Sequence, residues 1–388
     1  MAKICMLAFT HYSTDTRVRR EAEVLTARGD EVDFICLKED RTNQHTFNGV
    51  QLYPLSVRRY RGNSTLLYLT RYFSFFVRGF LLMTYLYYKN RYDIIQVHTM
   101  PDFMVFTALI PKICGAKVIL DVHDLMPELF MSKFGVEKRH WLIKLVTWIE
   151  LRSIAFAHNA IAVHMPHRDV LVSHGCPEEK FSILLNLPDS RIFGASCSAE
   201  RIPDNKFRLI YHGTLARRHG LEIAIRAVGL AKKQIPNVEL SIVGDGDNRE
   251  NLIRIVDDQG LNNYVKFSDG KVALEELSSL IRQADIGVVP ILKDVFTRYM
   301  LPVKLLEYVK VGIPVISSRT ETIEFYFDET MIRFFEPGNH TELAEQIVDL
   351  YNDQQARRLL VSNARTFNRE FAWEDHKTVY YDLIDSLL

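Results

Sequence analysis

The sequence predicts an α/β protein with two doubly wound parallel-sheet domains, and three observations lead to this prediction. Short apolar runs alternate with segments of helical periodicity along the whole chain, which is typical of βαβ units. The alternation restarts near residue 207, after a stretch rich in Ser, Ala, Pro, Asp and Asn. The length of 388 residues suits two domains of ordinary size, or three. We therefore expect two parallel sheets, each covered by helices.

In the first half, short aliphatic runs predict buried parallel strands. These strands are expected at Lys3–Phe9, Glu31–Leu37, Ile94–His98, Lys117–Asp121, Ala160–His164 and Phe181–Leu185. Helical periodicity between them predicts helices at Arg17–Arg28, Asp102–Ile113 and His140–Ala157. The most apolar stretch, Tyr72–Tyr88, is interrupted by Arg78 and falls short of the ~20 apolar residues that a membrane-spanning helix needs.

The second half repeats this pattern. Its strands are expected at Phe207–Tyr211, Val238–Val243, Tyr264–Phe267, Ile286–Pro290, Ile313–Ser317 and Met331–Phe335. Its helices are expected at Leu221–Lys233, Leu274–Ala284 and Pro302–Val311. We therefore predict an N-terminal domain at 1–190, a linker at 191–206 and a C-terminal domain at 207–371. A final amphipathic helix at 372–388 is expected to pack back toward the N-terminal domain.

Composition and charge exclude some classes of function. The 48 Lys and Arg residues balance 48 Asp and Glu residues, so the basic excess of a nucleic-acid-binding protein is missing. The five cysteines are scattered and odd in number, which is typical of reduced thiols in the cytoplasm. The first residues carry no secretory-type apolar region with a small-residue cleavage site. We expect a cytoplasmic protein with no nucleic-acid partner.

Two glycine-containing turns in the second half are candidate ligand sites. The segment Tyr211–Gly220 follows a strand and opens a helix, where backbone N–H groups can face a phosphate. Arg217 and Arg218 would add charge there, although an ordinary turn with solvated arginines is the alternative. The second turn, Gly244–Asp247, resembles a metal-binding pair of aspartates, but its place after a buried strand favours a tight turn.

Single side chains at the ends of elements are candidates for chemistry. Glu307 lies on a helix that Pro302 begins, and its carboxylate could bind both hydroxyls of a ribose or could simply face solvent. His98 and His123 end or follow neighbouring strands, where parallel sheets place ligands. Their pKa suits hydrogen bonding or proton transfer near neutral pH, and a purely structural role is the alternative.

Taken together, these segments resemble the retaining glycosyltransferases of family 4. The resemblance rests on His212–Leu215, Val243–Gly246, Pro302–Tyr308, Gly312–Ile316, Asp121–Glu128 and Leu185–Asp189. It covers nearly the whole chain and implies the GT-B fold, in which two Rossmann-like domains face a central cleft. It further implies a retaining, metal-independent transfer from a nucleotide sugar, with UDP as the default nucleotide, to a glycan or polyprenyl-linked acceptor in polysaccharide assembly. The nucleotide sugar is a co-substrate, and no cofactor is implied.

The resemblance also assigns roles to residues. Glu307 would bind the ribose, Arg218 the diphosphate, and His123 the donor sugar. Val303 and Lys304 would present backbone amides to the diphosphate, Gly270 and Lys271 would form the loop against the base, and Arg17 would face the phosphates from the first βα loop. The remaining binding positions are Gly213, Thr214, Arg217, Gly244 and Leu305.

The chain departs from the family pattern at several positions. Tyr299 stands where the family has the first of two glutamates, and Thr214 and His219 stand where it has Arg and Lys. The double glycine of the first loop is replaced by His11–Asp15. These changes keep two other hypotheses open, a sugar-nucleotide epimerase on the same scaffold and a degenerate partner protein that binds nucleotide sugar.

Basic and aromatic residues alternate over 58–91. This composition suits a surface that docks on anionic lipid, which would place the protein at the inner face of the membrane. The alternative is a helix buried in the N-terminal domain with basic ends.

Overall fold

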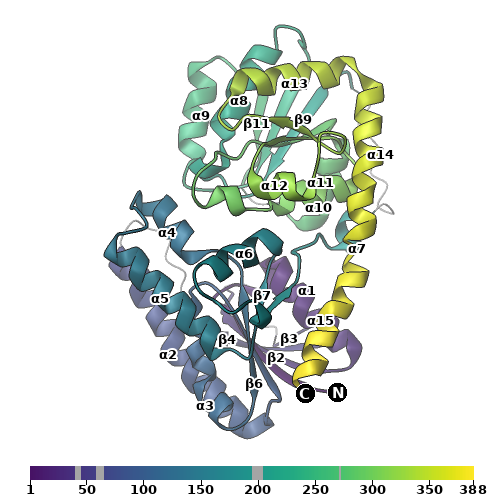
Figure 1. Cartoon of the computed structure of the whole chain (residues 1–388). Coiled ribbons are helices and arrows are strands. Elements are labelled where there is room, and N and C mark those ends of the chain that lie inside the picture. Colours follow the sequence, from purple (N-terminus) through teal and green to yellow (C-terminus); the bar gives the residue numbers. More distant parts are fainter. Residues whose placement is uncertain (40–44, 58–64, 195–203, 271) are drawn as a thin grey trace. The chain divides into compact units, whose positions relative to one another are not determined.

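The computed structural model describes residues 1–39, 45–57, 65–194, 204–270 and 272–388. The chain forms two units (Figure 1): unit 1 comprises Met1–Asn186 with Glu374–Leu388, and unit 2 comprises Leu187–Trp373. The last residues of the sequence therefore belong to the same unit as the first ones. The expected linker at 191–206 lies within unit 2, and its residues 195–203 fall outside the described ranges.

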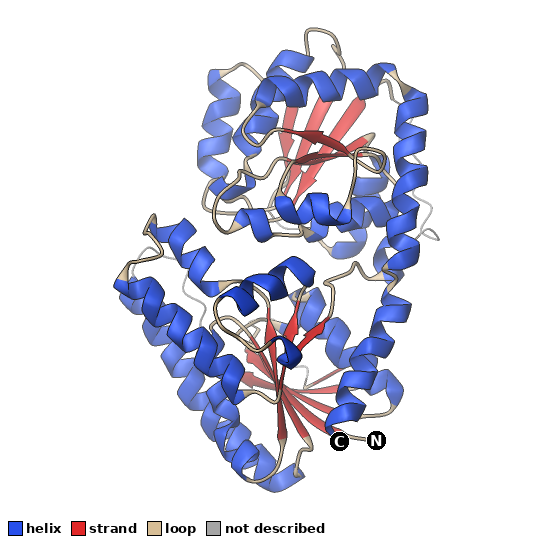
Figure 2. Ribbon diagram, viewed as in Figure 1, coloured by secondary structure: helices blue, strands red, loops and turns tan. Residues whose placement is uncertain are grey.

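Unit 1 is built on one sheet. Its strands are β1 (Lys3–Leu7), β2 (Glu31–Leu37), β3 (Thr46–Phe47), β4 (Val50–Leu55), β5 (Ile94–His98), β6 (Lys117–Val122), β7 (Asn159–Ala162) and β8 (Phe181–Ile183). Their order is β3-β4-β2-β1-β5-β6-β7-β8, and only β3 and β4 pair antiparallel. The central strands β1 and β5 are buried almost throughout because helices cover both faces of the sheet (Figure 2).

The helical segments of unit 1 follow the expected βαβ order. They are η1 (Tyr12–Thr14), α1 (Thr16–Arg28), α2 (Thr65–Asn90), η2 (Asp102–Ala108), α3 (Leu109–Ile113), α4 (Met126–Phe134), α5 (Trp141–Phe156), α6 (Met165–Ser173), η3 (Glu178–Lys180) and α15 (Trp373–Leu387). The side chain of Asp15 caps α1 by accepting from the Val18 N–H, and Gly29 ends it in the left-handed conformation. Gly79 lets α2 pack closely on the sheet, because a Cβ there would lie 3.0 Å from the Leu7 side chain.

Unit 2 is a second doubly wound unit. Its strands are β9 (Phe207–His212), β10 (Val238–Val243), β11 (Val265–Phe267), β12 (Ile286–Val289), β13 (Val315–Ser318) and β14 (Arg333–Phe335). They are all parallel, in the order β11-β10-β9-β12-β13-β14. Its helical segments are α7 (Ser190–Phe193), η4 (Arg217–His219), α8 (Leu221–Ala231), α9 (Arg249–Asp258), α10 (Leu274–Gln283), η5 (Thr297–Tyr299), α11 (Val303–Val311), α12 (Glu321–Tyr326), α13 (His340–Asn352) and α14 (Gln354–Glu370).

The strand order places a switch point in each sheet. In unit 1, β1 lies between β2 and β5, and in unit 2, β9 lies between β10 and β12. At a switch point, the connections that follow two neighbouring strands run to opposite sides of the sheet. A crevice forms between them at the carboxyl ends of the strands, and ligands bind in this crevice in doubly wound folds.

One predicted helix was wrong, and one strand was missed. The helix expected at Asp102–Ile113 is a 3-10 segment followed by a short α-helix, because Pro111 is tolerated only in a first helical turn and the α-helix starts at Leu109. Strand β4 was not predicted, since its residues alternate between apolar and polar and include Pro54. Among the described residues, no helix combines the length and apolarity needed to cross a bilayer.

Candidate functional site

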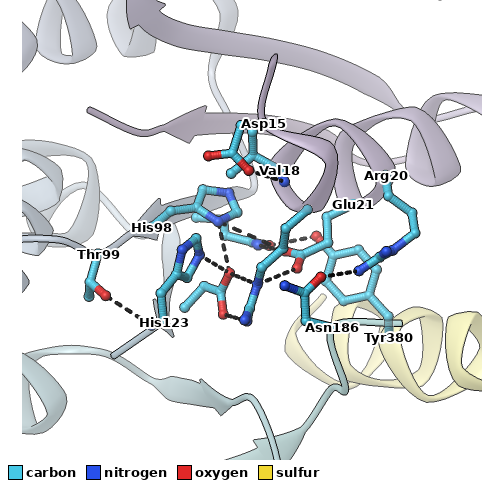
Figure 3. A network of polar contacts seen from close by, with 12 residues as sticks. Asp15, Val18, Arg20, Glu21, His98, Thr99, His123, Asn186 and Tyr380 are labelled. Atoms are coloured by element: carbon cyan, nitrogen blue, oxygen red, sulfur yellow. Dashed lines mark hydrogen bonds and ion pairs between the residues drawn. The ribbon is translucent and has the colours of Figure 1, made fainter. Parts of the chain in front are cut away.

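A network of buried polar side chains lies at the carboxyl ends of β5 and β6 in unit 1 (Figure 3). The parallel register places His98 of β5 beside Asp121 of β6. The Nδ1 of His98 and the Nε2 of His123 each lie 2.8 Å from Oδ2 of Asp121. The Thr99 hydroxyl accepts the backbone N–H of His123 at 2.9 Å. Asp121 therefore fixes both imidazole rings, and His123 keeps one ring nitrogen for another partner.

The position of Arg17 corrects its expected role. We expected Arg17 on the first βα loop, facing phosphates, but it lies in the first turn of α1 with 5% of its surface exposed. Its guanidinium bonds both oxygens of Asp121, and its Nε lies 3.3 Å from Oε1 of Glu21. Because two carboxylates already neutralise this charge, Arg17 orients Asp121 rather than offering a free cation to a ligand.

The network continues to the C-terminal helix. The Gln96 amide donates to Glu21 at 2.7 Å, and the hydroxyl of Tyr380 on α15 donates to Gln96 at 2.6 Å. Burial alone would raise the pKa of Asp121, but Arg17 and the two histidines hold that pKa well below its usual range. Asp121 is thus a fixed negative charge, and its hydrogen bond raises the pKa of His98 against the effect of burial.

The residues His98, Asp121 and His123 offer atoms close enough to hold a metal ion. The lone pairs of Asp121, however, already accept from Arg17, His98 and His123. A divalent cation would have to displace the Arg17 guanidinium or share its carboxylate. The geometry therefore favours a hydrogen-bonded network here.

In unit 2, three turns meet at the carboxyl ends of β9, β10 and β11. Gly213 follows β9 with φ 116°, and Gly244 follows β10 with φ 143°, so both use the left-handed region that favours glycine. A Cβ on Gly244 would clash with the carbonyl of Gly213. The Ser268 hydroxyl accepts the Gly244 N–H at 3.0 Å and donates to the Gly270 carbonyl at 2.6 Å. The turns are thus held close together at one edge of the sheet.

Helix α11 places charged side chains beside these turns. Its first-turn residues are Val303, Lys304 and Leu305. The Leu305 N–H donates to the Pro302 carbonyl at 3.0 Å, so the N–H groups of Val303 and Lys304 are the ones that this helix start leaves for a ligand. The Nζ of Lys304 lies 4.9 Å from the ring centre of Tyr211 and would lie 3.6 Å from a Cβ on Gly213. One turn further on, Oε2 of Glu307 lies 3.0 Å from Nε2 of His212. Lys304 and Glu307 therefore flank the turn after β9.

Positively charged side chains with few hydrogen-bonded partners gather at the carboxyl ends of β9, β10 and β11. Within the described residues, the Lys304 ammonium has no hydrogen-bonded partner, and neither has the buried Nε of Arg218. Burial and then Arg218 lower the pKa of Lys304 to about 8, against the opposing effect of Glu307. Burial, Lys304 and Arg218 lower the pKa of His219 to about 2, so this imidazole is neutral at pH 7. Such a group of cations suits an anionic ligand.

Most of the predicted binding residues of unit 2 lie close together in the structure, and a few do not. Gly213, Gly244, Gly270, Lys304 and Glu307 lie around the turns described above. Thr214 and Arg217 lie on the same turn with exposed side chains. Tyr299 ends the 3-10 segment η5, where its ring stacks with Arg298. Lys271 lies outside the described residues.

Family models match most of the chain. The model described as Glycosyltransferase Family 4 matches residues 14–189, and the model described as Glycosyl transferases group 1 matches residues 196–367. The chain belongs to glycosyltransferase family 4. The fold of this family-4 chain, with two Rossmann-like units, is the GT-B fold, as the sequence predicted.

Individual relatives agree with this assignment. The family-4 chain is 26% identical over 236 residues to D-inositol 3-phosphate glycosyltransferase of Paenarthrobacter aurescens, covering 58% of this chain and 56% of that protein. It is 24% identical over 265 residues to the O-antigen biosynthesis glycosyltransferase WclY of Escherichia coli, covering 63% and 66%. The match therefore spans between half and two thirds of each of these relatives. The crystal structure of Anabaena Alr3699/HepE with UDP-glucose superposes with a TM-score of 0.72, at 16% identity, over 100% of this chain and 99% of that one.

Sequence reasoning missed several partners in this family-4 site. Asp121 was part of a motif, but its role as common acceptor for His98, His123 and Arg17 depends on strand register and on a helix distant in sequence. Ser268 was not singled out, because a lone serine after a short strand carries no recognisable pattern. The Lys304 ammonium, which lies over the Tyr211 ring, was also missed, since Lys304 was considered only for its backbone amide.

Proposed function

We propose that this chain is a retaining glycosyltransferase that moves a sugar from a UDP-sugar to a glycan or polyprenyl-linked acceptor without a metal ion. The observation that carries the proposal is the edge of unit 2, where Lys304, Arg218 and glycine turns lie beside Glu307. This combination fits a nucleoside diphosphate, which joins two phosphates to a ribose. The Anabaena structure with UDP-glucose has the same fold, which supports UDP as the nucleotide.

The residues of unit 2 divide the work of binding the donor. The Thr214 amide and the amides of Val303 and Lys304 at the start of α11 face the diphosphate, where a helix N-terminus favours negative charge. The Gly213 N–H itself donates to the Val243 carbonyl. Arg218 and Lys304 stabilise the charge that develops on the leaving diphosphate, as preorganised groups do. These two cations take the electrostatic role that a divalent ion has in other transferases. Glu307 accepts hydrogen bonds from the ribose hydroxyls.

Unit 1 supplies His123 to the transferred sugar in this proposal. Asp121 holds Nε2 of His123, so Nδ1 is the ring nitrogen that remains for the sugar. Arg17 and Asp121 act as positioning residues, because they fix His123 without contacting the substrate. The sugar retains its anomeric configuration during transfer.

The acceptor in this proposal is a glycan or a polyprenyl-linked intermediate of polysaccharide assembly. The O-antigen enzyme among the relatives supports the class of pathway. The predicted basic and aromatic region at 58–91 supports contact with an anionic membrane surface, and its residues 58–64 lie outside the described ranges. Helix α2 buries one face in unit 1 and exposes another, which supports this contact over the alternative of a helix buried in the N-terminal domain.

The experiment that tests the proposal is a thermal-shift panel of UDP, GDP, dTDP and ADP with their sugars, run on wild type and Glu307→Ala. A ligand well above its Kd raises the melting temperature by mass action. We expect a shift with UDP and UDP-sugars that disappears in Glu307→Ala. A shift with another nucleotide would reject UDP, and the absence of any shift would reject donor binding by unit 2.

A second measurement separates transfer from other reactions of a bound donor. Acceptor-dependent release of UDP, with NMR of the product's anomeric proton, reports both transfer and its stereochemistry. A UDP-sugar that changes configuration without an acceptor would identify an epimerase instead. Product with inverted configuration would contradict the retaining mechanism.

A further inference from the structure

Exposed apolar side chains are concentrated in one part of unit 1. Of the eighteen large apolar side chains that are exposed among the described residues, eleven lie between Phe73 and Trp148. They belong to α2, α3, α4 and α5. They are Phe73, Val77, Leu81, Tyr85, Tyr88, Leu109, Ile113, Phe134, Trp141, Leu145 and Trp148. An exposed group of this size on one region of a protein marks an interaction surface.

Helix α2 presents one apolar face to the sheet and another to solvent. Its exposed residues follow helical spacing, with Phe73, Val77, Leu81 and Tyr85 four residues apart. The opposite face is buried through Tyr72, Phe75, Gly79, Met83 and Leu86. A helix needs only one apolar face to join a protein core, so the second face has another partner.

Helix α5 repeats this arrangement and carries two tryptophans. Trp141 is 69% exposed, Leu145 is 44% exposed and Trp148 is 55% exposed, at spacings of four and three residues. The Arg152 guanidinium stacks over the Trp148 ring at 5.7 Å. Ile143, Val146, Ile154 and Glu150 face inward. Tryptophan is favoured where an apolar environment meets a polar one.

The two helices lie on the same side of the unit 1 sheet. Both α2 and α5 pack against η2. Phe76 of α2 contacts Phe103 of η2 at 5.7 Å between ring centres, and Phe156 of α5 contacts Phe106 of η2 at 5.1 Å. Figure 1 shows α2, α3 and α5 alongside one another. Their exposed faces can therefore contact one partner at the same time.

The charge around these faces is strongly positive. In residues 70–91 and 131–156, the exposed acidic side chains are limited to Glu137. The exposed basic side chains are Arg71, Arg78, Lys89, Arg91, Lys133, Lys138, Arg139, Lys144 and Arg152. Apolar side chains bordered by cations match a surface with anionic groups above an apolar interior, which describes an anionic lipid bilayer.

We propose that α2 and α5 form a lipid-docking face, on which Trp141 and Trp148 enter the interface of an anionic membrane. The inference deepens the proposed membrane contact, which the sequence placed at 58–91 alone, by adding α5. A second copy of the chain fits less well, because a symmetric pair would bring two cation-rich faces together. Docking lays the helices along the bilayer surface, with their other faces kept in the core of unit 1.

The three tryptophans of the chain permit a direct test. Trp373 is 8% exposed, so a Trp373→Phe variant reports on Trp141 and Trp148 alone. Mixed with vesicles containing phosphatidylglycerol, this variant is expected to show a blue shift of its emission and quenching by brominated lipid chains. No shift, or an equal shift with purely zwitterionic vesicles, would overturn the proposal.

Charge variants test the same face by co-sedimentation. Lys144→Gln with Arg152→Gln is expected to lower the vesicle partition coefficient by about 30-fold, given the attraction of each cation near an anionic surface. The matched controls Lys233→Gln and Phe325→Ser change an exposed cation and an exposed aromatic residue of unit 2, and they should pellet like wild type. Equal losses in the controls would overturn the proposal.

Two further measurements show which proposal a negative result contradicts. A blue shift that depends on protein concentration in the absence of vesicles would identify a second copy as the partner. The thermal shift with UDP reports unit 2 and should be the same in all these variants. Loss of lipid binding with an intact UDP shift therefore concerns the docking face, whereas loss of the UDP shift in wild type concerns the proposed function.

Discussion

The two units of this protein differ in whether their cationic side chains have hydrogen-bonded partners. In unit 1, the Arg17 guanidinium is neutralised by Asp121 and Glu21, and the network ends in hydrogen bonds from Gln96 and Tyr380. In unit 2, Lys304 and Arg218 stand beside glycine turns without hydrogen-bonded partners among the described residues. A network that is already neutral holds side chains in place, whereas a group of unpaired cations gains stability when an anion arrives.

The two units are therefore suited to different tasks. Unit 1 is suited to orient a reacting group, and unit 2 is suited to bind a charged ligand. Changes in unit 1 should therefore alter turnover, and changes in unit 2 should alter affinity for the donor.

The largest effect is expected from His123→Ala. Loss of a positioned proton donor or charge-stabilising group should lower turnover by on the order of 10²-fold or more. Affinity for UDP, measured by calorimetry, should stay as in wild type because the nucleotide contacts lie in unit 2. Turnover near the wild-type value would remove His123 from the mechanism, and a parallel loss of UDP affinity would break the division between the units.

The next effect is expected from Lys304→Met. A hydrogen bond to a charged group is worth about 1.5–3 kcal/mol, so UDP should bind roughly 10- to 100-fold more weakly. Uridine, which has no phosphate, should bind equally to both proteins. The free variant should also melt at a higher temperature than wild type, because a partly buried cation whose charge is disfavoured by its surroundings is removed. Equal losses for UDP and uridine would show a general distortion of the site.

The pKa of Lys304 predicts a smaller, pH-dependent effect. Since this ammonium loses its proton as the pH rises through about 8, the Kd for UDP should increase roughly five- to tenfold between pH 7 and pH 9. Lys304→Arg keeps its charge over this range and should show a flat profile. A wild-type profile that is flat as well would mean that Lys304 does not contact the diphosphate.

The smallest effects concern stability, and they differ in sign between the units. Burial lowers the pKa of His219 to about 2, so unit 2 should lose stability as the pH falls below about 6.5, by up to about 1.4 kcal/mol per pH unit. Hydrogen bonds to Glu128 and Glu150 outweigh burial and raise the pKa of His174 to about 9. His174 therefore stabilises unit 1 below about pH 6.5, and this contribution is lost as the pH rises through 9.

Hydrogen exchange measured at pH 5.5, 7.0 and 9.0 reports the two units separately. Faster exchange in unit 2 at pH 5.5 and in unit 1 at pH 9.0 is expected. His219→Gln and His174→Gln should each remove the response of its own unit. A response that survives in both variants would assign the pH dependence to other groups.

The fold could be predicted from the sequence to a large extent, because each buried parallel strand is a local apolar run. The runs at Glu31–Leu37, Ile94–His98 and Val238–Val243 match β2, β5 and β10 from end to end. Strand β4 was not recognisable, since it lies near the sheet edge and its residues alternate in polarity. Where strands have one covered face, the apolar run that marks them is lost.

The candidate site was less predictable for a related reason. Side chains that follow a strand, such as His123 and Gly213, could be placed from position alone. The pairing of Arg17 with Asp121 joins residues 104 positions apart, and no local pattern encodes it. Likewise, the exposed tryptophans of α5 have the same spacing as core residues, so only packing against η2 distinguishes the two faces.

The bond between Tyr380 and Gln96 has a consequence for how the protein is made. Because Tyr380 lies on α15, all of unit 2 is inserted between the two segments that form unit 1. A ribosome must therefore synthesise the whole of unit 2 before the polar network around Glu21 can be completed. The first segment of unit 1 therefore leaves the ribosome before Tyr380 can bond Gln96. A chain released early, without its last helix, would lack this hydrogen bond.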